Sequence, residues 1–522
     1  MNQITLEQMT QVVREFIARK NWDQLAQVAR ELQAKHPSSP EGFFAMGVVV
    51  KQHRDYHSAE KFFVHALTLN SERYDVAIEL AQVYFSIQRY QDSLSLIEEY
   101  KSYIDNSAYY LLETAKLFHW LGLHENAWRF AKKADSVQPN NDVIKATVAE
   151  YGVLLGKVDE AKQIYEKLIS KYPNYQKHHY DFSKLQKAQD HSHVHKMKHI
   201  LETNGLAPEQ NIYLYYALGK QLEDLEVWDE AFHYYEKAGS VILEKSNYDV
   251  AIDIEVMEKV ISTCDEDWML KPSFSLHENT GRTPIFIVGL PRTGSTLIER
   301  VLASHPDVES ADETFYFPMA LNNQVLGSYF GEISKKTVSG GIDINWKQLA
   351  ENYCSLIDFK LSRSPYFIDK YPFNFIILGF IAKAFPSAKF VYLDRHPLDA
   401  CFAMFKQSYF KFAYCLEDVG NYYIAHKRLK KHWEKLFGDR IVNVSYENFV
   451  SAQREETVKL LSSLGLSFSE QCMEFHLNPT ASGTASTLQV REKVHRRSVG
   501  RWKNFARHLA PLERNLKAHN LL

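Results

Sequence analysis

Small and apolar residues recur at a fixed interval along the first half of the chain. One series repeats every 34 residues, at Val13, Gly47, Ala81, Ala115 and Ala149. A second series follows each marker by twelve residues, at Leu25, Ala59, Ser93, Ala127 and Ala161. Apolar side chains stand again four residues after each of these positions, which keeps them on one face of a helix. The pattern therefore predicts helices packed in pairs.

About seven such pairs are predicted. Gly219 and Ala231 resume the two series after a slip, and Ser183 marks a poorly formed sixth unit before them. The pattern resembles the tetratricopeptide repeat, a helix-turn-helix unit of this length. A generic bundle with accidental spacing is the alternative, but five units keep strict register. The resemblance implies a helical tetratricopeptide-repeat solenoid over residues 1–245, with a surface that holds a peptide or protein.

After Pro284 the pattern changes to short apolar runs that alternate with helical stretches. The runs of strand type lie at 285–288, 366–368, 389–393 and 441–445. Helical periodicity fills 295–303, 347–363, 374–385, 397–407, 419–437 and 454–464. Short strands that are apolar on both faces are typical of a parallel sheet covered by helices. We predict a connecting helix and linker at 246–283 and a P-loop-like α/β domain with a central parallel sheet at 284–522.

Composition narrows the class of protein only a little. Hydrophobic residues make up 45% and charged residues 24%, and the net charge of −3 gives no reason to expect a nucleic-acid partner. The five cysteines are scattered and lack C-x-x-C spacing, which disfavours disulfides and zinc. The N-terminus is polar and no apolar run reaches the roughly 18 residues of a membrane span. We expect a cytoplasmic protein.

A Gly-rich turn follows the first predicted strand. From Gly289 to Thr296 the sequence resembles a Walker A loop, G-x-x-x-x-G-K-[ST], except that Ser295 stands in place of the lysine. In such a turn the backbone N–H groups and the positive end of the helix dipole face an anion. The missing lysine argues against an ordinary ATP or GTP hydrolase.

Basic residues follow the neighbouring strands as well. Lys370 comes after the second strand, Arg395 after the third, and Arg292 lies inside the loop itself. Ligands of parallel sheets bind at the carboxyl ends of the strands. Three cations at one edge, beside a phosphate-binding turn, predict a polyanionic ligand.

The loop, Lys370 and the segment 390–395 together resemble the sulfotransferases that use 3′-phosphoadenosine 5′-phosphosulfate (PAPS). They are similar above all to tyrosylprotein sulfotransferases and to bacterial sulfotransferases fused to tetratricopeptide repeats, over residues 284–510. The resemblance implies that PAPS is the co-substrate and that no metal is needed. It implies transfer of a sulfuryl group to an acceptor hydroxyl or amine, with a protein tyrosine as the leading candidate.

The resemblance also implies the nucleotide-binding residues. The 5′-phosphosulfate would be held by Arg292, Thr293, Gly294, Ser295 and Thr296, and the 3′-phosphate by Arg395 and Arg501. The other implied contacts are Tyr446, on the nucleotide, and Ser486, Thr487 and Gln489, in a loop that closes over it. The chain departs from the family at Ala403 and Gln407, where a serine and a basic residue are usual; Lys406 and Ser408 are the neighbours that would compensate.

Catalytic roles follow from the same resemblance. It implies that Glu313 is the general base, with Asp312 the neighbour most easily confused with it. Lys370 and Arg292 would face the charge that develops on the bridging oxygen, with Ser486 as a neutral donor.

Two other functions stay open. A P-loop kinase or NTPase needs a lysine at position 295 and a Mg²⁺-binding carboxylate, for which Asp394 could stand. A non-catalytic repeat adaptor with a degenerate nucleotide domain is supported by Ala403 and Gln407. Carbohydrate, lipid and small-molecule acceptors also stay open.

Overall fold

The computed structural model describes residues 5–273, 282–478, 480, 483–484 and 487–522. The chain divides into two compact units, Met1–Tyr151 and Gly152–Leu522, each of which is described by itself. The domain limits expected at residues 245 and 284 stay predictions. Part of the predicted linker and Ser486 lie outside the described residues.

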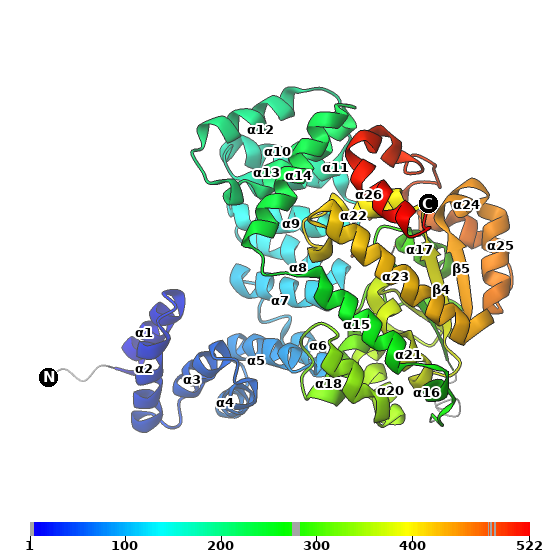
Figure 1. Cartoon of the computed structure of the whole chain (residues 1–522). Coiled ribbons are helices and arrows are strands. Elements are labelled where there is room, and N and C mark those ends of the chain that lie inside the picture. The colour runs from blue at the N-terminus through cyan, green and yellow to red at the C-terminus, as the bar shows by residue number, and fades with distance from the viewer. Residues whose placement is uncertain (1–4, 274–281, 479, 481–482, 485–486) are drawn as a thin grey trace. The chain divides into compact units, whose positions relative to one another are not determined.

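The first unit is built of helices in pairs (Figure 1, blue to cyan). Its helices are α1 (Leu6–Ala18), α2 (Trp22–Lys35), α3 (Pro40–Gln52), α4 (Tyr56–Leu69), α5 (Tyr74–Ser86), α6 (Tyr90–Tyr100), α7 (Ala108–Trp120) and α8 (His124–Val137). Helix α9 (Asp142–Leu154) crosses into the second unit. The predicted repeat fold is confirmed.

The periodic small residues allow the helices of a pair to approach closely. A Cβ atom added at Gly47 would lie 2.5 Å from the ring of Phe63, so only glycine leaves room for that ring. At the equivalent positions of the next pair, the Ser93 hydroxyl donates to the Ala81 carbonyl over 2.8 Å. Both contacts join the first marker of a unit to its second helix, which explains why small residues recur at this interval along the chain.

The second unit begins with further helices of the repeat type. They are α10 (Val158–Lys171), α11 (Gln176–Leu185), α12 (Ser192–Thr203), α13 (Ile212–Asp224) and α14 (Trp228–Lys245), followed by α15 (Val250–Thr263) and α16 (Glu266–Leu270). The close approach of the first repeats recurs here, since a Cβ at Gly219 would lie 2.7 Å from the Tyr235 ring. In the irregular sixth pair, α11 packs against α13.

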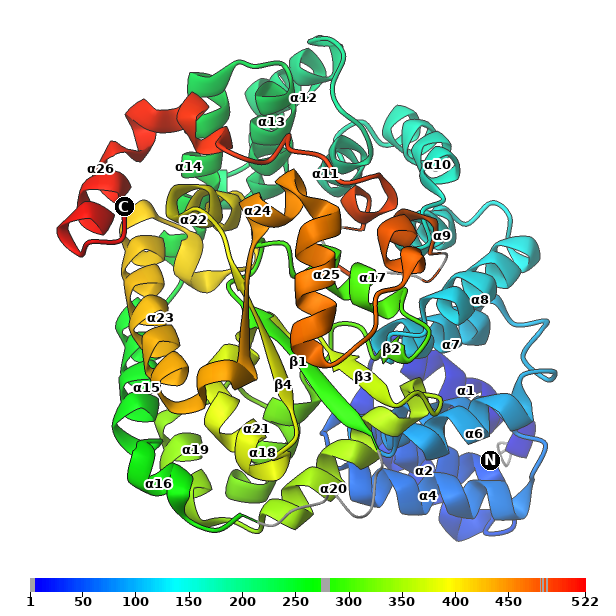
Figure 2. The same ribbon diagram turned by 90° about the vertical axis from the view of Figure 1, so that its right-hand side faces the viewer.

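A parallel sheet follows, in the order β2-β3-β1-β4-β5 among the described residues (Figure 2). Its strands are β1 (Thr283–Gly289), β2 (Val308–Ser310), β3 (Tyr366–Asp369), β4 (Lys389–Asp394) and β5 (Ile441–Ser445). The predicted parallel sheet is confirmed. The pattern missed β2, because three residues at the edge of a sheet are too few to show a periodicity.

Ten α-helices are described after β1. They are α17 (Ser295–Ala303), α18 (Tyr316–Leu326), α19 (Lys335–Gly340), α20 (Trp346–Ile357), α21 (Leu378–Ala384), α22 (Pro397–Phe405), α23 (Leu416–Phe437), α24 (Tyr446–Ser451), α25 (Gln453–Leu464) and α26 (Ala506–Ala518). Of these ten, six match predicted stretches, and α18, α19, α24 and α26 were not predicted. The expected helix at 374–385 starts instead as a 3₁₀ segment, Pro372–Ile377. Of the helices in the described part of the chain, none has the length and apolar character to cross a membrane.

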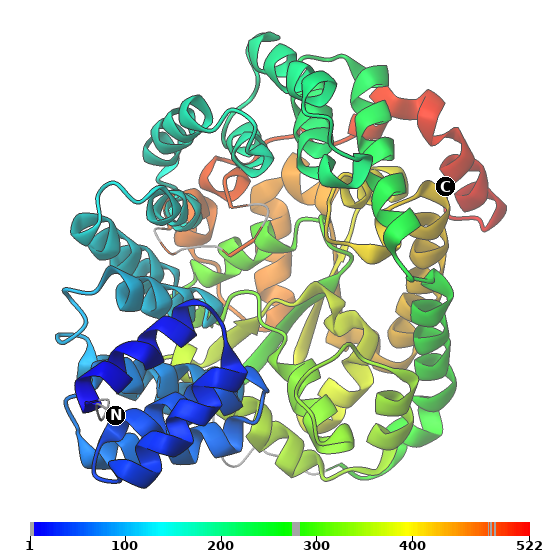
Figure 3. The same cartoon turned by 90° about the vertical axis from the view of Figure 1, so that its left-hand side faces the viewer.

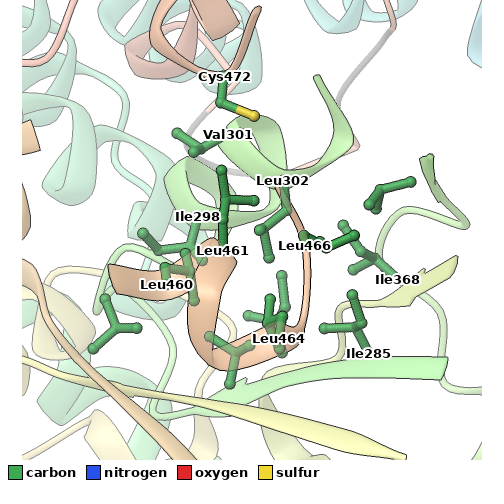
Figure 4. Close-up of a cluster of buried hydrophobic side chains, with 14 of the residues drawn as sticks. Ile285, Ile298, Val301, Leu302, Ile368, Leu460, Leu461, Leu464, Leu466 and Cys472 are labelled. Carbon is green, nitrogen blue, oxygen red and sulfur yellow. The ribbon is translucent and has the colours of Figure 1, made fainter. Parts of the chain in front are cut away.

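Alternate residues of β1 face two different cores. Ile285 and Ile287 join a buried aliphatic cluster with residues of α17 and α25 (Figure 4). Phe286 points to the other face, where its ring lies 6.2 Å from Phe317 of α18 and 6.1 Å from Tyr353 of α20. A strand buried on both faces has both sets of side chains apolar, as the sequence pattern indicated. Beside this sheet, α15 runs along α23 (Figures 1 and 3).

Candidate active site

The sheet order brings the basic residues to one edge. Strand β1 lies between β3 and β4, because the chain adds β2 and β3 on one side and then crosses to the other. At such a switch point the loop after the central strand opens between the ends of its neighbours. Arg292 in that loop, Lys370 after β3 and Arg395 after β4 therefore gather at the carboxyl edge.

The loop after β1 depends on glycine at two positions. Gly289 has a φ of +135°, and a Cβ there would lie 2.7 Å from the Leu393 carbonyl oxygen. Gly294 has a φ of +103°, and its Cβ would lie 2.6 Å from the Tyr446 ring. Helix α17 then starts at Ser295 without a side-chain cap among the described residues. The N–H groups of its first turn are therefore directed at the site, where the helix dipole favours an anion.

The hydroxyls of the loop stabilise its shape. Thr293 is buried and donates to the Leu290 carbonyl over 2.6 Å. Thr296 lies 3.2 Å from the Thr484 hydroxyl. The Thr293 side chain is therefore used for a hydrogen bond within the loop, and a ligand would contact the backbone of this residue.

Arg395 joins the loop to the C-terminal segment. Its Nη1 donates to the Arg292 carbonyl over 2.8 Å and its Nη2 to the Ser498 carbonyl over 2.5 Å, while its guanidinium lies 5.0 Å from the centre of the Tyr446 ring. Burial lowers the pKa of Arg395, but a guanidinium stays charged. Its buried Nε has no hydrogen-bond partner within the described part of the chain. A buried donor of this kind fits a bound anion such as a phosphate.

Lys370 is fully buried between carboxylates. Its Nζ donates to Glu313 and lies 3.8 Å from Glu299. Burial acts to lower the pKa of Lys370, but the charges of Glu313, Glu299 and Asp312 outweigh it and the pKa is raised. The lysine is therefore held as an ammonium. Its partner Glu313 has a side chain that is 38% exposed, so the carboxylate is the member of the pair that reaches the surface of the site.

The edge strand β2 positions Glu313. Ser310 of β2 pairs with Ile368 of β3, and the contact continues where the Lys370 N–H donates to the Asp312 carbonyl over 3.4 Å. This register sets the residue after Asp312 opposite Lys370. The meeting of Glu313 and Lys370 thus depends on a strand that the sequence pattern did not reveal.

Glu299 is a site residue that the sequence reasoning missed. It lies on the inner side of α17, where burial raises its pKa to about 7 and the Ser310 hydroxyl donates to it over 2.6 Å. In the sequence it is marked only as a carboxylate that, together with Arg300, interrupts the apolar helical run from Leu297 to Leu302. The Lys370 ammonium thus interacts with both Glu313 and Glu299. The buried Glu299 is protonated more readily than an ordinary glutamate, because its pKa is raised.

Asp369, just before Lys370, is also fully buried. It accepts hydrogen bonds from the Tyr353 hydroxyl over 2.9 Å and from Asn374 over 3.2 Å. Burial raises its pKa to about 7. These contacts tie the end of β3 to α20 and to the 3₁₀ segment, so that Lys370 stands on a rigid support.

Arg501 and Lys406 share one partner on a repeat helix. Arg501 Nε lies 2.7 Å and Lys406 Nζ 2.8 Å from Oε1 of Glu223, near the end of α13. The Tyr235 hydroxyl donates to the other carboxylate oxygen over 3.0 Å. Burial acts to raise the pKa of Glu223, but Lys406 and Arg501 outweigh it and the pKa is lowered. Of the two residues expected to bind the 3′-phosphate, Arg501 therefore pairs with a repeat helix, as does Lys406, whereas Arg395 does not.

The remaining predicted nucleotide contacts surround the loop. The Tyr446 ring packs against Gly294, and Gln489 lines a small cavity together with Gly294, Thr296 and Tyr446. The buried Thr487 hydroxyl donates to the Thr484 carbonyl. The roles assigned to these residues stay predictions.

The two departures from the family lie on α22 and just after it. Gln407 donates to the Ala403 carbonyl over 3.3 Å, so its side chain turns back onto the helix. Its own carbonyl accepts from the Tyr216 hydroxyl over 3.2 Å. Neither side chain replaces the hydroxyl and the positive charge that the family has there.

A cavity of about 830 Å³ opens beside the loop and Glu313. Aromatic side chains make up nine of its 27 lining residues, and the others include both polar and aliphatic groups. The lining residues are Asp253, Val256, Pro291, Arg292, Gly294, Ser295, Thr296, Glu313, Phe315, Pro318, Met319, Tyr329, Phe330, Gly331, Glu332, Ile333, Tyr371, Pro372, Phe373, Ile376, Tyr409, Phe410, Lys411, Phe412, Tyr422, Gly483 and Thr484. In the described ranges, no group of three or more His, Cys, Asp or Glu side chains is arranged to hold a metal ion.

Comparison with known proteins supports the resemblance drawn from the motifs. Residues 284–470 match the model of the sulfotransferase family. An uncharacterised protein of Aquifex aeolicus (strain VF5) is 26% identical over 369 residues, which are 69% of this chain and 48% of that protein. Protein-tyrosine sulfotransferase 1 of Danio rerio is 24% identical over 233 residues, 42% of this chain and 65% of the fish protein. The matched residues thus span 48% of the Aquifex protein and 65% of the fish protein, less than two thirds of either relative.

Two solved structures have a low similarity to the chain. The sulfotransferase domain of the Synechococcus PCC 7002 olefin synthase has 21% identity and a TM-score of 0.31, covering 45% of this chain and 97% of that domain. A tetratricopeptide repeat protein from Parabacteroides merdae has 15% identity and a TM-score of 0.30, covering 47% and 93%. From the family model and the sequence relatives, the C-terminal region of this chain matches the sulfotransferase family, and protein-tyrosine sulfotransferases are among its relatives at low identity.

Proposed function

We propose that the chain transfers a sulfuryl group from PAPS to the hydroxyl of an acceptor. One observation carries the proposal: Glu313, paired with the buried Lys370, lines the same cavity as Arg292 and the N-terminus of α17. Sulfuryl transfer needs a base, cations and a group that binds the anionic donor; here Glu313, Arg292 and the turn line the cavity, and the buried Lys370 lies behind Glu313. PAPS supplies an activated sulfuryl group on a phosphate leaving group.

The nucleotide end of the site suits a ligand with phosphates at two positions. The N–H groups of the first turn of α17 would bind the 5′ end, next to Arg292. The buried Nε of Arg395 is available to a 3′-phosphate. Lys406 and Arg501 add two positive charges that the single carboxylate of Glu223 does not balance. This excess of positive charge favours a bisphosphate over a nucleotide with one 5′ chain.

Glu313 accepts the proton of the acceptor hydroxyl. A carboxylate is a weak base for a phenol of pKa about 10, so the proton leaves as the new S–O bond forms. Once protonated, Glu313 no longer balances the charge of Lys370. The ammonium of Lys370 then faces the oxygen that gains negative charge as the old S–O bond breaks, and Arg292 assists from the loop.

Nucleotide preference tests the proposal against the kinase and adaptor alternatives. We expect calorimetry on the full chain to give at least tenfold tighter binding of 3′-phosphoadenosine 5′-phosphate than of ADP. Equal affinities, or Mg²⁺-dependent turnover of ATP, would contradict the assignment.

The acceptor is tested separately. Incubation of the protein with ³⁵S-labelled PAPS and an extract of the source cell should label an acceptor, and a protein tyrosine stays one prediction for it. Tight binding of the bisphosphate with no labelled product in any extract fraction would favour the adaptor.

A further inference from the structure

The wall of the cavity is a continuous series of aromatic rings that starts beside Glu313. Phe315, two residues after Glu313, has its ring 6.3 Å from that of Tyr371. The Tyr371 ring lies 5.6 Å from Phe373, on the 3₁₀ segment that follows Lys370. The same strand end that holds Lys370 therefore also starts the aromatic wall.

The series continues to α23, whose Tyr422 also lines the cavity. Phe373 lies 6.1 Å from Phe412, and Phe412 stacks on Tyr422 of α23 with ring centres 3.8 Å apart and planes at 9°. Phe410 lies 5.8 Å from Phe412 and 4.5 Å from Tyr409. Such a wall offers ring faces and edges to a flat apolar ligand along its whole length.

Several of these rings are exposed, although aromatic side chains are usually buried in a soluble protein. Phe315 is 56% exposed, Phe330 65% and Tyr409 50%, and all three line the cavity. Large apolar groups that gather at one exposed place mark a binding site. An apolar occupant would cover them.

Three other charged residues that line the cavity, Asp253, Glu332 and Lys411, already have partners within the protein. Lys411 lies 2.9 Å from Glu332. Asp253 accepts from the Tyr248 hydroxyl over 2.5 Å, and burial raises the pKa of Asp253. A peptide segment in this space would bring backbone N–H and C=O groups against aromatic walls, where they lose their hydrogen bonds to water. An uncharged ring system brings no such groups.

We propose that the acceptor is a small uncharged phenol whose apolar ring system lies along this wall with its hydroxyl at Glu313. The inference rests on the proposed function for its chemistry. The volume of about 830 Å³ is in the range of cavities that bind small molecules. In the reaction the phenol oxygen bonds to sulfur, the bond from sulfur to the 5′-phosphate oxygen breaks, and the proton passes to Glu313. The products are an aryl sulfate and 3′-phosphoadenosine 5′-phosphate.

Binding of 2-naphthol to the full chain tests the inference directly. The titration is done by calorimetry, with and without 3′-phosphoadenosine 5′-phosphate, on the unaltered protein and on Phe330→Ser and Tyr409→Ser. Both changes are at exposed side chains, so neither removes a buried contact of the core. We expect 2-naphthol to bind and each variant to raise its Kd at least fivefold.

A matched control shows that the loss is local. Phe468 is also exposed, at 36%, and does not line the cavity. Phe468→Ser should leave the Kd of 2-naphthol unchanged. No binding to the unaltered protein, or an equal effect of all three variants, would overturn the inference, and so would binding of a tyrosine-containing peptide in place of 2-naphthol.

The two proposals fail in different ways. If the bisphosphate binds but 2-naphthol does not, the phenol acceptor is wrong and the proposed transfer stands. If 2-naphthol binds along the wall but the bisphosphate binds no better than ADP, the cavity is confirmed and the proposed transfer is wrong. Formation of naphthyl sulfate from PAPS, reduced by both cavity variants, would support both.

Discussion

The two sides of the candidate site are built on different principles. The proposed nucleotide side consists of strand ends and a helix N-terminus, and its charged groups are buried and held by several partners, as Arg395 and Lys370 are. The proposed acceptor side consists of aromatic rings from separate segments, and Phe315, Phe330 and Tyr409 are half exposed or more. Backbone geometry positions the first set, and side-chain packing alone forms the second.

This difference indicates which side tolerates change. Parallel strands force their carboxyl ends together, so an anion site at that edge survives most substitutions elsewhere. The aromatic wall has no such constraint, and a few ring substitutions would alter which acceptor it fits. We infer that chemistry resides on the rigid side and specificity on the aromatic side.

The largest effect should come from the group that joins the two sides. Glu313→Ala removes the proposed base and should lower kcat by about 10²–10⁴-fold, while the Kd of 3′-phosphoadenosine 5′-phosphate stays nearly the same. Single-turnover transfer and calorimetry measure the two quantities. Glu470→Gln, on an exposed pair with Arg454, is the control and should change neither. Loss of nucleotide binding with residual turnover would place Glu313 on the nucleotide side.

Lys370 tests whether the rigid side stabilises the transition state. Lys370→Met keeps the length of the side chain but removes its charge, and kcat should fall about 10²–10³-fold. Glu299 and Glu313 lose their partner, so the free energy of unfolding should fall as well. Thermal unfolding separates this loss from the kinetic one. A protein as active as the unaltered one would remove Lys370 from the mechanism.

The network around Glu223 tests whether the repeat helix α13 is part of the rigid side. Glu223→Gln leaves Lys406 and Arg501 without a negative partner and should lower the free energy of unfolding by about 3 kcal/mol. Because the pKa of Glu223 is lowered in the folded state, the contribution of this carboxylate to stability depends on pH. Its stabilising contribution is present above the unfolded-state value near 4.5 and is lost as pH falls through the lower folded value. Urea unfolding of Glu223→Gln at pH 7 and pH 4 checks both, since the variant should lack that loss at low pH.

Arg395 should affect nucleotide choice more than chemistry. Arg395→Ala removes the buried Nε and should raise the Kd of 3′-phosphoadenosine 5′-phosphate by about 10–100-fold, the usual range for a charge-assisted hydrogen bond. The Kd of ADP should change much less. If both nucleotides lose affinity equally, Arg395 acts only through its bonds to Arg292 and Ser498.

The smallest effect concerns the proton on Glu299. Its pKa is raised to about 7 by burial, while Lys370, Asp312, Ser310 and Arg300 surround it. The folded state therefore binds a proton between pH 4.5 and about 7 that the unfolded state releases, so stability falls as pH rises through that window. Glu299→Gln should flatten the melting temperature between pH 5 and pH 7.5. If the melting temperature of the variant falls as steeply with pH as that of the unaltered protein, the buried Asp369 is the source of this pH dependence.

Much of the rigid side was predictable because local rules govern it. The run at 285–288, the glycines of the turn and the helical stretch at 295–303 together define the strand-turn-helix unit, and the structure has β1 and α17 at those places. Lys370 and Arg395 could be assigned to the same edge because each follows a strand. Glu299 was missed, since nothing local separates a buried carboxylate from one that faces water.

Contacts between distant segments could not be predicted in the same way. Glu313 meets Lys370 through β2, whose three residues carry no readable period. Arg501 meets Glu223 across nearly three hundred positions of sequence. In both cases the packing of helices and strands determines which residues meet. The hydrophobic pattern specifies only which face of each element is buried.

By itself, the sequence determined the repeat helices, the parallel sheet and the Gly-rich turn between β1 and α17, because spacing, strand ends and glycine dihedral angles are local properties. Only the tertiary structure decided that Lys370 is shared by two carboxylates and that Glu223 holds Lys406 and Arg501. It also decided that aromatic residues from Phe315 to Tyr422 form one wall. Burial and packing between segments far apart in the chain set these contacts, and a local pattern of hydrophobic positions does not specify them.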